Sequence, residues 1–110
     1  MCLQAAVELL ISDERWLWRE DFEHVAVSWT RHPFTGQQWV TVDFTAAAEA
    51  LLTGVLPCTA DERQILLVAA SVAEGVPVDL RQAAGNLNVD GVALVTRAFV
   101  RAAGYDGFTP

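Results

Sequence analysis

The sequence has no lysine, and all of its basic residues are arginines. Seven basic residues stand against fourteen acidic ones in 110 residues, which gives a net charge of −7 at pH 7. Nonspecific binding to nucleic acids and to anionic membranes depends on basic side chains that meet phosphates. The charge balance therefore argues against both kinds of partner. The lack of lysine, together with seventeen alanines, is typical of a GC-rich bacterial genome.

Cysteine and histidine are also scarce, with two of each. Cys2 and Cys58 are too few for a disulfide framework, so we expect free thiols in the cytoplasm. His24 and His32 stand in no pattern of cysteines or carboxylates that would hold a metal ion. The serines lack the surroundings of a catalytic nucleophile. We therefore expect no metal, no cofactor and no catalytic residue, and a protein that is not an enzyme.

Long apolar runs are missing as well. No run approaches the length that crosses a bilayer, and the first residues lack the basic start of a signal peptide. A cytoplasmic protein without a membrane partner is therefore expected. Hydrophobic residues nevertheless make up 53% of the chain and charged residues only 19%. Because a small domain has much surface for its volume, we expect part of this apolar material at an interface, unless the alanines merely inflate the count.

The clearest element in the sequence is a helix over residues 60–74. Thr59 and Glu62 have the spacing of a capping box at its start. Gly75 suits the left-handed residue that follows a helix, and Pro77 prevents continuation. The body of this helix is apolar nearly all round, which predicts a central helix covered on several sides.

Residues 24–31 and 38–44 alternate between apolar and polar side chains, which predicts a β-hairpin. A register that pairs Trp29 with Val42 gathers the large apolar residues on one face, with a four-residue loop between the arms. A lone hairpin is marginally stable, so this face must pack on helices or on another chain.

The remaining patterns complete a prediction of one α+β domain over residues 1–104. They predict an N-terminal helix over 1–11, a short helix over 46–52 capped by Thr45, and two helices over 80–87 and 91–103 capped by Asp79 and Asp90. Asn88 is expected to take a left-handed turn conformation between these two helices. The predicted buried face of the last helix consists of Val92, Val95, Phe99 and Ala102. Residues 14–23 fit a helix and an extended segment equally, and residues 105–110 are expected to form a flexible tail.

The last helices, over about residues 60–103, resemble a helix–turn–helix unit. The small, turn and apolar positions of that motif match Ala84, Leu87, Asn88, Val89 and Leu94, with Asn88 in place of the usual glycine. The resemblance implies DNA contacts by Arg81, Arg97 and Arg101. The residues that would face a DNA groove offer little to bases or phosphates, and they are Asp90, Gly91, Val92, Val95 and Thr96.

All four tryptophans lie among the first forty residues. Aromatic side chains are enriched at protein interfaces, and the candidate interface residues are Trp16, Trp18, Trp39, His32 and Phe34. The competing interpretation is a plain core, in which Trp29 is buried and the other tryptophans cover the hairpin. Trp39 falls on the polar face of the predicted hairpin beside His32, where only a partner would cover it.

The sequence therefore predicts a function by protein–protein contact, as an adaptor, a regulator or a homo-oligomeric accessory protein. The expected partner is a second copy in a homodimer or a different protein. A DNA-binding transcriptional regulator that uses the helix–turn–helix-like half is the alternative. A small-ligand pocket between the hairpin and the central helix is a third hypothesis.

Overall fold

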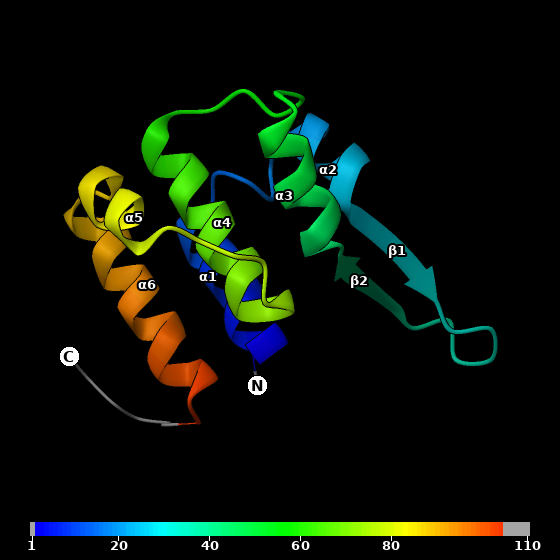
Figure 1. Cartoon of the computed structure of the whole chain (residues 1–110). Coiled ribbons are helices and arrows are strands. Elements are labelled where there is room, and N and C mark those ends of the chain that lie inside the picture. Colours follow the sequence, from blue (N-terminus) through cyan, green and yellow to red (C-terminus); the bar gives the residue numbers. More distant parts are fainter. Residues whose placement is uncertain (1, 105–110) are drawn as a thin grey trace.

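The structure, a computed structural model, describes residues 2–104, and of Trp39 it describes the backbone alone. Its elements, in order, are α1 (Cys2–Asp13), α2 (Glu20–Ala26), β1 (Val27–Arg31), β2 (Gln38–Val42), α3 (Phe44–Leu52), α4 (Ala60–Glu74), α5 (Leu80–Asn86) and α6 (Val89–Ala102). The predicted α+β class is confirmed, because the helices of this range form one body from which a two-stranded hairpin projects (Figure 1). The tail predicted over residues 105–110 lies outside the described residues.

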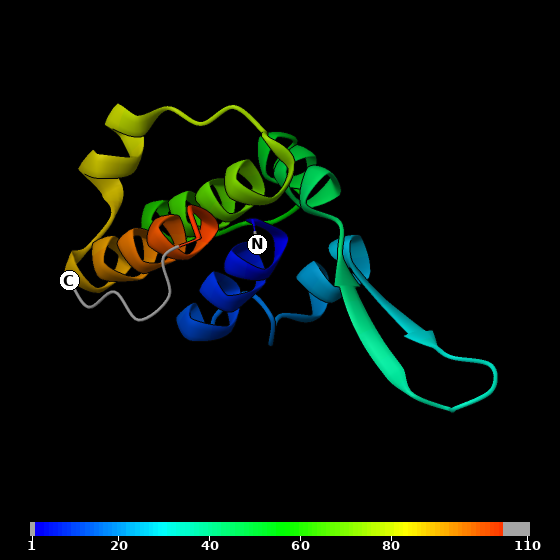
Figure 2. The ribbon, with the colours of Figure 1, turned by 90° about the horizontal axis from the view of Figure 1, so that it is seen from below.

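Helix α4 lies at the centre of the helical body, as its sequence predicts. The Thr59 hydroxyl accepts a hydrogen bond from the backbone N–H of Glu62 at 3.2 Å, and the Glu62 carboxylate accepts one from the Thr59 N–H at 3.0 Å. Gly75 follows the helix in the left-handed conformation, with φ of 73°. Helix α4 contacts α1, α3, α5 and α6, so it is covered on several sides (Figure 2).

The core is built around Trp16, which is fully buried. Its indole N–H donates to the backbone carbonyl of Glu62 at 2.8 Å, and its ring lies 5.6 Å from that of Phe22, centroid to centroid. The Arg19 guanidinium lies over the Trp16 ring, with Cζ 4.6 Å from the ring centroid, a cation–π contact. The expected roles of two tryptophans are thus wrong, because Trp16 lies in the core and Trp29 is 66% exposed.

Residues 14–19 take neither of the two forms that the sequence favoured, and the chain turns here with Glu14 at φ of 68°. Helix α2 begins at Glu20 and continues through Ala26. The first strand therefore begins at Val27, and its predicted start at residue 24 is wrong. Carboxylates in the first turn of α2 complement the helix dipole, which favours a helix where the alternation of apolar residues suggested a strand.

The hairpin pairs its strands antiparallel, with Trp29 opposite Val40. The predicted pairing of Trp29 with Val42 is therefore wrong by two residues. A shift of two keeps every residue on its predicted face, because side chains alternate along a strand. The loop has the predicted length of four residues, but it spans residues 33–36 and is centred one residue earlier than predicted. The His32 N–H donates to the Gln37 carbonyl at 2.8 Å, at the two ends of this loop.

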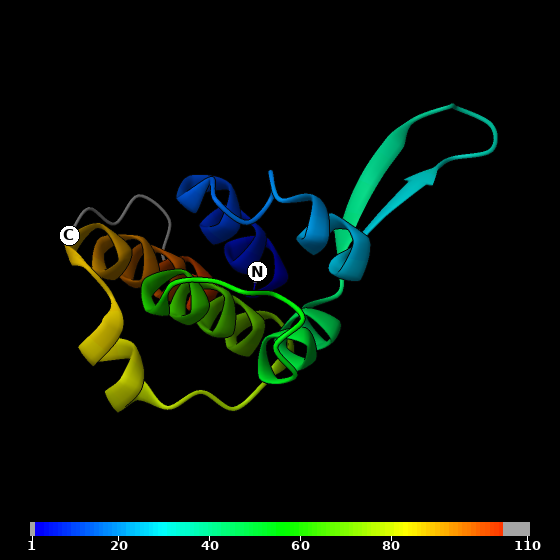
Figure 3. The same ribbon diagram turned by 90° about the horizontal axis from the view of Figure 1, so that it is seen from above.

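Both arms of the hairpin join helices directly. Strand β1 follows α2 without a loop, and only Asp43 separates β2 from α3. The Asp43 N–H donates to the Ala26 carbonyl at 2.7 Å, which closes the base of the hairpin. The Asp43 carboxylate also caps α3 by accepting from the Ala46 N–H at 3.0 Å, so the predicted cap at Thr45 is wrong. The base is thus held by α2 and α3, while the distal half projects from the body (Figure 3).

The turn between α5 and α6 also differs from its prediction. Helix α5 is capped by Asp79, as expected. Helix α6 begins at Val89 and is capped by Asn88, whose side chain accepts from the Gly91 N–H at 2.7 Å; the predicted cap at Asp90 is wrong. Asn88 is extended, with φ of −78° and ψ of 178°, and so does not take the predicted left-handed conformation.

Helix α6 presents a different face to the body from the one that was predicted. Val92 and Phe99 are 47% and 70% exposed, whereas Gly91 and Ala98 are buried, and the other two residues of the predicted face are half-buried. The small buried residues allow a close approach. A Cβ atom on Gly91 would lie 3.1 Å from Oδ1 of Asp61 on α4. The close packing of these small residues therefore sets the orientation of α6, and the larger apolar side chains Val92 and Phe99 remain exposed.

An ion-pair network joins the end of α1 to α4 and to the start of α6. The Arg15 guanidinium lies 2.7 Å from the Asp13 carboxylate and 2.6 Å from the Asp61 carboxylate. Asp61 also accepts from the backbone N–H of Asn88 at 3.0 Å. The hydrogen bond that Arg15 donates to the Asp13 carboxylate is the main reason that the pKa of Arg15 is raised above its ordinary value. Asp61 therefore links three elements that are distant in sequence.

Candidate functional site

An apolar hollow of about 470 Å³ lies where the hairpin meets the segment between α1 and α2. We call it the hairpin groove. Six apolar side chains and two carboxylates line it: Ile11, Leu17, Trp18, Val27, Trp29, Val40, Glu14 and Glu23. The hypothesis of a pocket between the hairpin and the central helix differs from this arrangement, because the lining comes from the chain around α1 and α2 and contains no residue of α4.

The hairpin groove exists because only the base of the apolar hairpin face is covered. Val27 and Val42 pack against the core. Further along the strands, Trp29 is 66% exposed and Val40 is 40% exposed. Trp18 extends the same surface and is 84% exposed. A continuous apolar surface with two exposed indoles is typical of an interaction site, whereas isolated exposed apolar residues are common everywhere.

The charges around the hairpin groove are unpaired within the described part of the chain. Glu14 and Glu23 line the groove and form none of its ion pairs, and neither does Arg31 at the far end of β1. By contrast, the neighbouring Asp21 binds Arg19, and the hydrogen bond from that guanidinium lowers the pKa of the Asp21 carboxyl. The charged side chains that line the groove are therefore both acidic, and the basic Arg31 lies outside its lining at the far end of β1.

The structure separates the predicted interface residues. Trp18 lines the groove, whereas Trp16 is buried in the core and leaves the candidate interface. Phe34 lies in the hairpin loop and is 91% exposed. Nδ1 of His32 accepts from the Phe34 and Thr35 N–H groups, each at 3.2 Å, so this histidine holds the loop. The side chain of Trp39 lies outside the description.

Sequence reasoning missed the central residue of the groove. Trp29 was assigned to the core, and Val40, Glu23 and Arg31 were not candidates. The signal was present, because the alternation places Trp29 and Val40 on the apolar face of a hairpin that needs a cover. Only the long-range packing of Trp16 on α4 reveals that the core is already filled.

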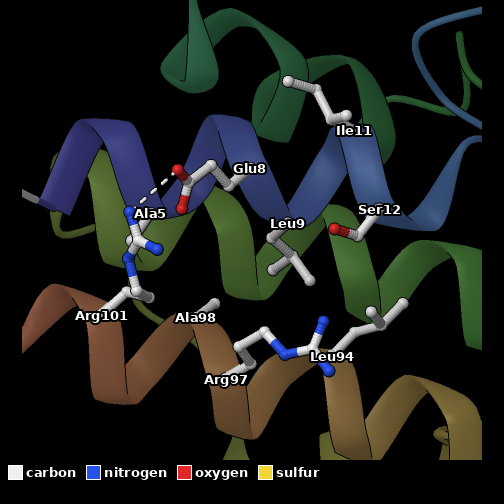
Figure 4. A pocket seen from close by; sticks show the side chains of 9 residues that line it. All are labelled: Ala5, Glu8, Leu9, Ile11, Ser12, Leu94, Arg97, Ala98 and Arg101. Carbon is white, nitrogen blue, oxygen red and sulfur yellow. Dashed lines mark hydrogen bonds and ion pairs between the residues drawn. The ribbon is translucent and has the colours of Figure 1, made fainter. Parts of the chain in front are cut away.

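A second hollow, of about 240 Å³, lies between α1 and α6. Arg101 pairs with Glu8 across it at 3.0 Å, and Arg97 lines the same hollow beside Leu94 (Figure 4). Two of the three candidate DNA-contact arginines thus line the hollow beside α1, and of these Arg97 is exposed and Arg101 is half-buried. The third, Arg81, is exposed on α5.

Other possible site chemistry is sparse over residues 2–104. No group of three or more histidine, cysteine or acidic residues in this range is arranged to hold a metal ion. None of the helices described here has the length and apolar character needed to cross a membrane. Comparisons of the chain with protein-family models, with curated proteins and with solved structures find no significant match. The function must therefore be inferred from the surface of the chain itself.

Proposed function

We propose that this protein acts in the cytoplasm by protein–protein contact through the hairpin groove, and that it is not an enzyme. The uncovered apolar face of the hairpin carries the proposal, because Trp29 on this face and Trp18 beside it in the groove lining are both largely exposed. Burial of a large apolar side chain contributes about 1.5–3 kcal/mol. A partner that covered both indoles would also support a hairpin that is marginal alone.

Helix α6 offers a competing apolar stripe, formed by Val89, Val92 and Phe99. The groove is the better candidate for two reasons. It is hollowed, so a partner side chain can be surrounded there, and tryptophan dominates the energetics of protein interfaces more often than valine. The stripe on α6 therefore serves as the matched control surface.

The proposal is tested with three immobilised baits: the wild type, Trp29→Ser and Phe99→Ser. The two substituted side chains have similar exposure, 66% and 70%, so both variants remove comparable apolar surface. Proteins from a lysate of the native host, including free copies of this chain, should bind the wild type and Phe99→Ser and be lost from Trp29→Ser. Equal retention by all three baits would mean that the groove is not the contact surface. Circular dichroism checks that each variant is folded.

DNA binding through the helix–turn–helix-like half is the alternative proposal, and less of the surface supports it. Arg97 and Arg101 line the hollow beside α1, and Arg101 is already paired with Glu8. The net charge of −7 also opposes contact with phosphates. If the alternative is right, duplex DNA should bind at low salt, and Arg81→Ala should weaken that binding. The absence of any retention on duplex DNA at low salt would exclude it.

A further inference from the structure

The apolar face of the hairpin carries opposite charges at its two ends. Side chains alternate along a strand, so Val27, Trp29 and Arg31 share one face of β1. Arg31 and Val27 each lie two residues from Trp29, about 7 Å in opposite directions. Glu23 lines the groove with Val27 at the base of the hairpin, and Glu14 lines it too. The order along the face is therefore acidic, apolar and basic.

This order makes the face complementary to itself. A two-fold axis that passes beside Trp29 would turn the face end over end, so that its basic end meets the acidic end of the other copy. Arg31 of each copy would then lie opposite Glu23 of the other, and the two Trp29 rings would meet near the axis. The same patch on both subunits, with each contact made twice, is the requirement for a symmetric dimer.

We infer that the occupant of the hairpin groove is a second copy of this chain, in a symmetric dimer in which Arg31 of each copy pairs with Glu23 of the other. This inference rests on the proposed contact function and names its partner. A basic peptide would satisfy Glu14 and Glu23 but would meet the like charge of Arg31 at the other end of the face. A second copy supplies both signs of charge in the order that the face requires.

Charge reversal tests the pairing directly. Arg31→Glu places two acidic ends together, and Glu23→Arg places two basic ends together, so each variant alone should be mainly monomeric. We expect the dissociation constant of the dimer to rise about tenfold or more in each, because both symmetric contacts become repulsive. Glu49→Arg and Arg81→Glu change the charge of exposed residues outside the groove by the same amounts, and both should remain dimeric.

The decisive sample is an equimolar mixture of Arg31→Glu and Glu23→Arg. In a mixed dimer each contact again joins opposite charges, so native mass spectrometry should detect the heterodimer although neither variant forms a homodimer. A wild type that is monomeric even at millimolar chain concentration would overturn the inference. A dimer that survives both reversals would also overturn it, because the contact would then lie elsewhere. If the wild type is a monomer but Trp29→Ser loses a different bound protein, the second copy is wrong and the contact function stands.

Discussion

Trp16 and Trp18 are two residues apart, and the structure gives them opposite roles. Trp16→Phe removes the pyrrole part of a fully buried indole together with its hydrogen bond to the Glu62 carbonyl. The lost burial and the space left behind cost about 2 kcal/mol, and the lost hydrogen bond costs about 1 kcal/mol. We therefore expect Trp16→Phe to lower the free energy of unfolding by about 3 kcal/mol. Trp18→Phe, at a residue that is 84% exposed, should change it by less than about 0.5 kcal/mol.

Urea unfolding followed by far-ultraviolet circular dichroism measures both values without depending on tryptophan fluorescence. Both substitutions are made on a Trp29→Ser background, because dimer formation would otherwise add to the apparent stability. The predicted result is a lower midpoint for Trp16→Phe with an unchanged slope, and an unchanged midpoint for Trp18→Phe. Equal midpoints for the two variants would show that Trp16 is not the centre of the core, and the account of the hairpin groove would lose its basis.

Three further predictions concern the helical body. Gly91→Ala should lower stability by up to about 2 kcal/mol in thermal or urea unfolding, because its Cβ would crowd Asp61, whereas Gly85→Ala, whose Cβ meets nothing within 4 Å, should raise stability by up to about 1 kcal/mol. Burial raises the pKa of Asp61, but hydrogen bonds from a backbone N–H and a guanidinium outweigh it, so the pKa lies below its ordinary value. The lowered pKa stabilises the fold above the unfolded-state pKa of about 3.9, and this stability is lost as the pH falls through the lower folded-state pKa. Asp61→Asn should therefore be less stable than the wild type at neutral pH and should lose less stability than the wild type when the pH is lowered. Urea unfolding at each pH measures both differences. Burial raises the pKa of the Cys58 thiol, so at about pH 8 it should react more slowly with Ellman's reagent than the exposed Cys2, and equal rates in the single-cysteine variants would contradict this.

The elements that the sequence predicts well are those fixed by neighbouring residues. Helix α4 is right at both ends because Thr59, Glu62 and Gly75 define its caps within a few residues. The faces of the hairpin are also right, since alternation is a local property. The register is off by two because alternation cannot distinguish shifts by an even number, and the choice depends on the loop and on the closure of the base by Asp43 and Ala26.

The predictions are wrong where contacts between segments distant in the sequence determine which side chains are buried. On helix α6 a helical wheel favours the face that carries Val92 and Phe99, but the close approach of Gly91 to α4 selects a face with small residues. Trp16 and Trp29 are the same residue type, and their neighbours in the sequence do not show which of the two is buried. The hydrogen bond that Trp16 donates to the Glu62 carbonyl, across 46 residues of sequence, holds Trp16 in the core, whereas Trp29 is 66% exposed. The sequence therefore indicated exposed aromatic side chains near the hairpin, and Trp18 is one of them, but it did not indicate that Trp29 is exposed.

Sedimentation velocity measures whether a second copy of the chain covers the hairpin groove. The wild type and Trp29→Ser are compared at matched concentrations, with Phe99→Ser as the control of similar exposure. We expect the wild type and Phe99→Ser to sediment as dimers and Trp29→Ser to sediment as a monomer. A monomeric wild type, or a Trp29→Ser dimer as tight as that of the wild type, would contradict this expectation.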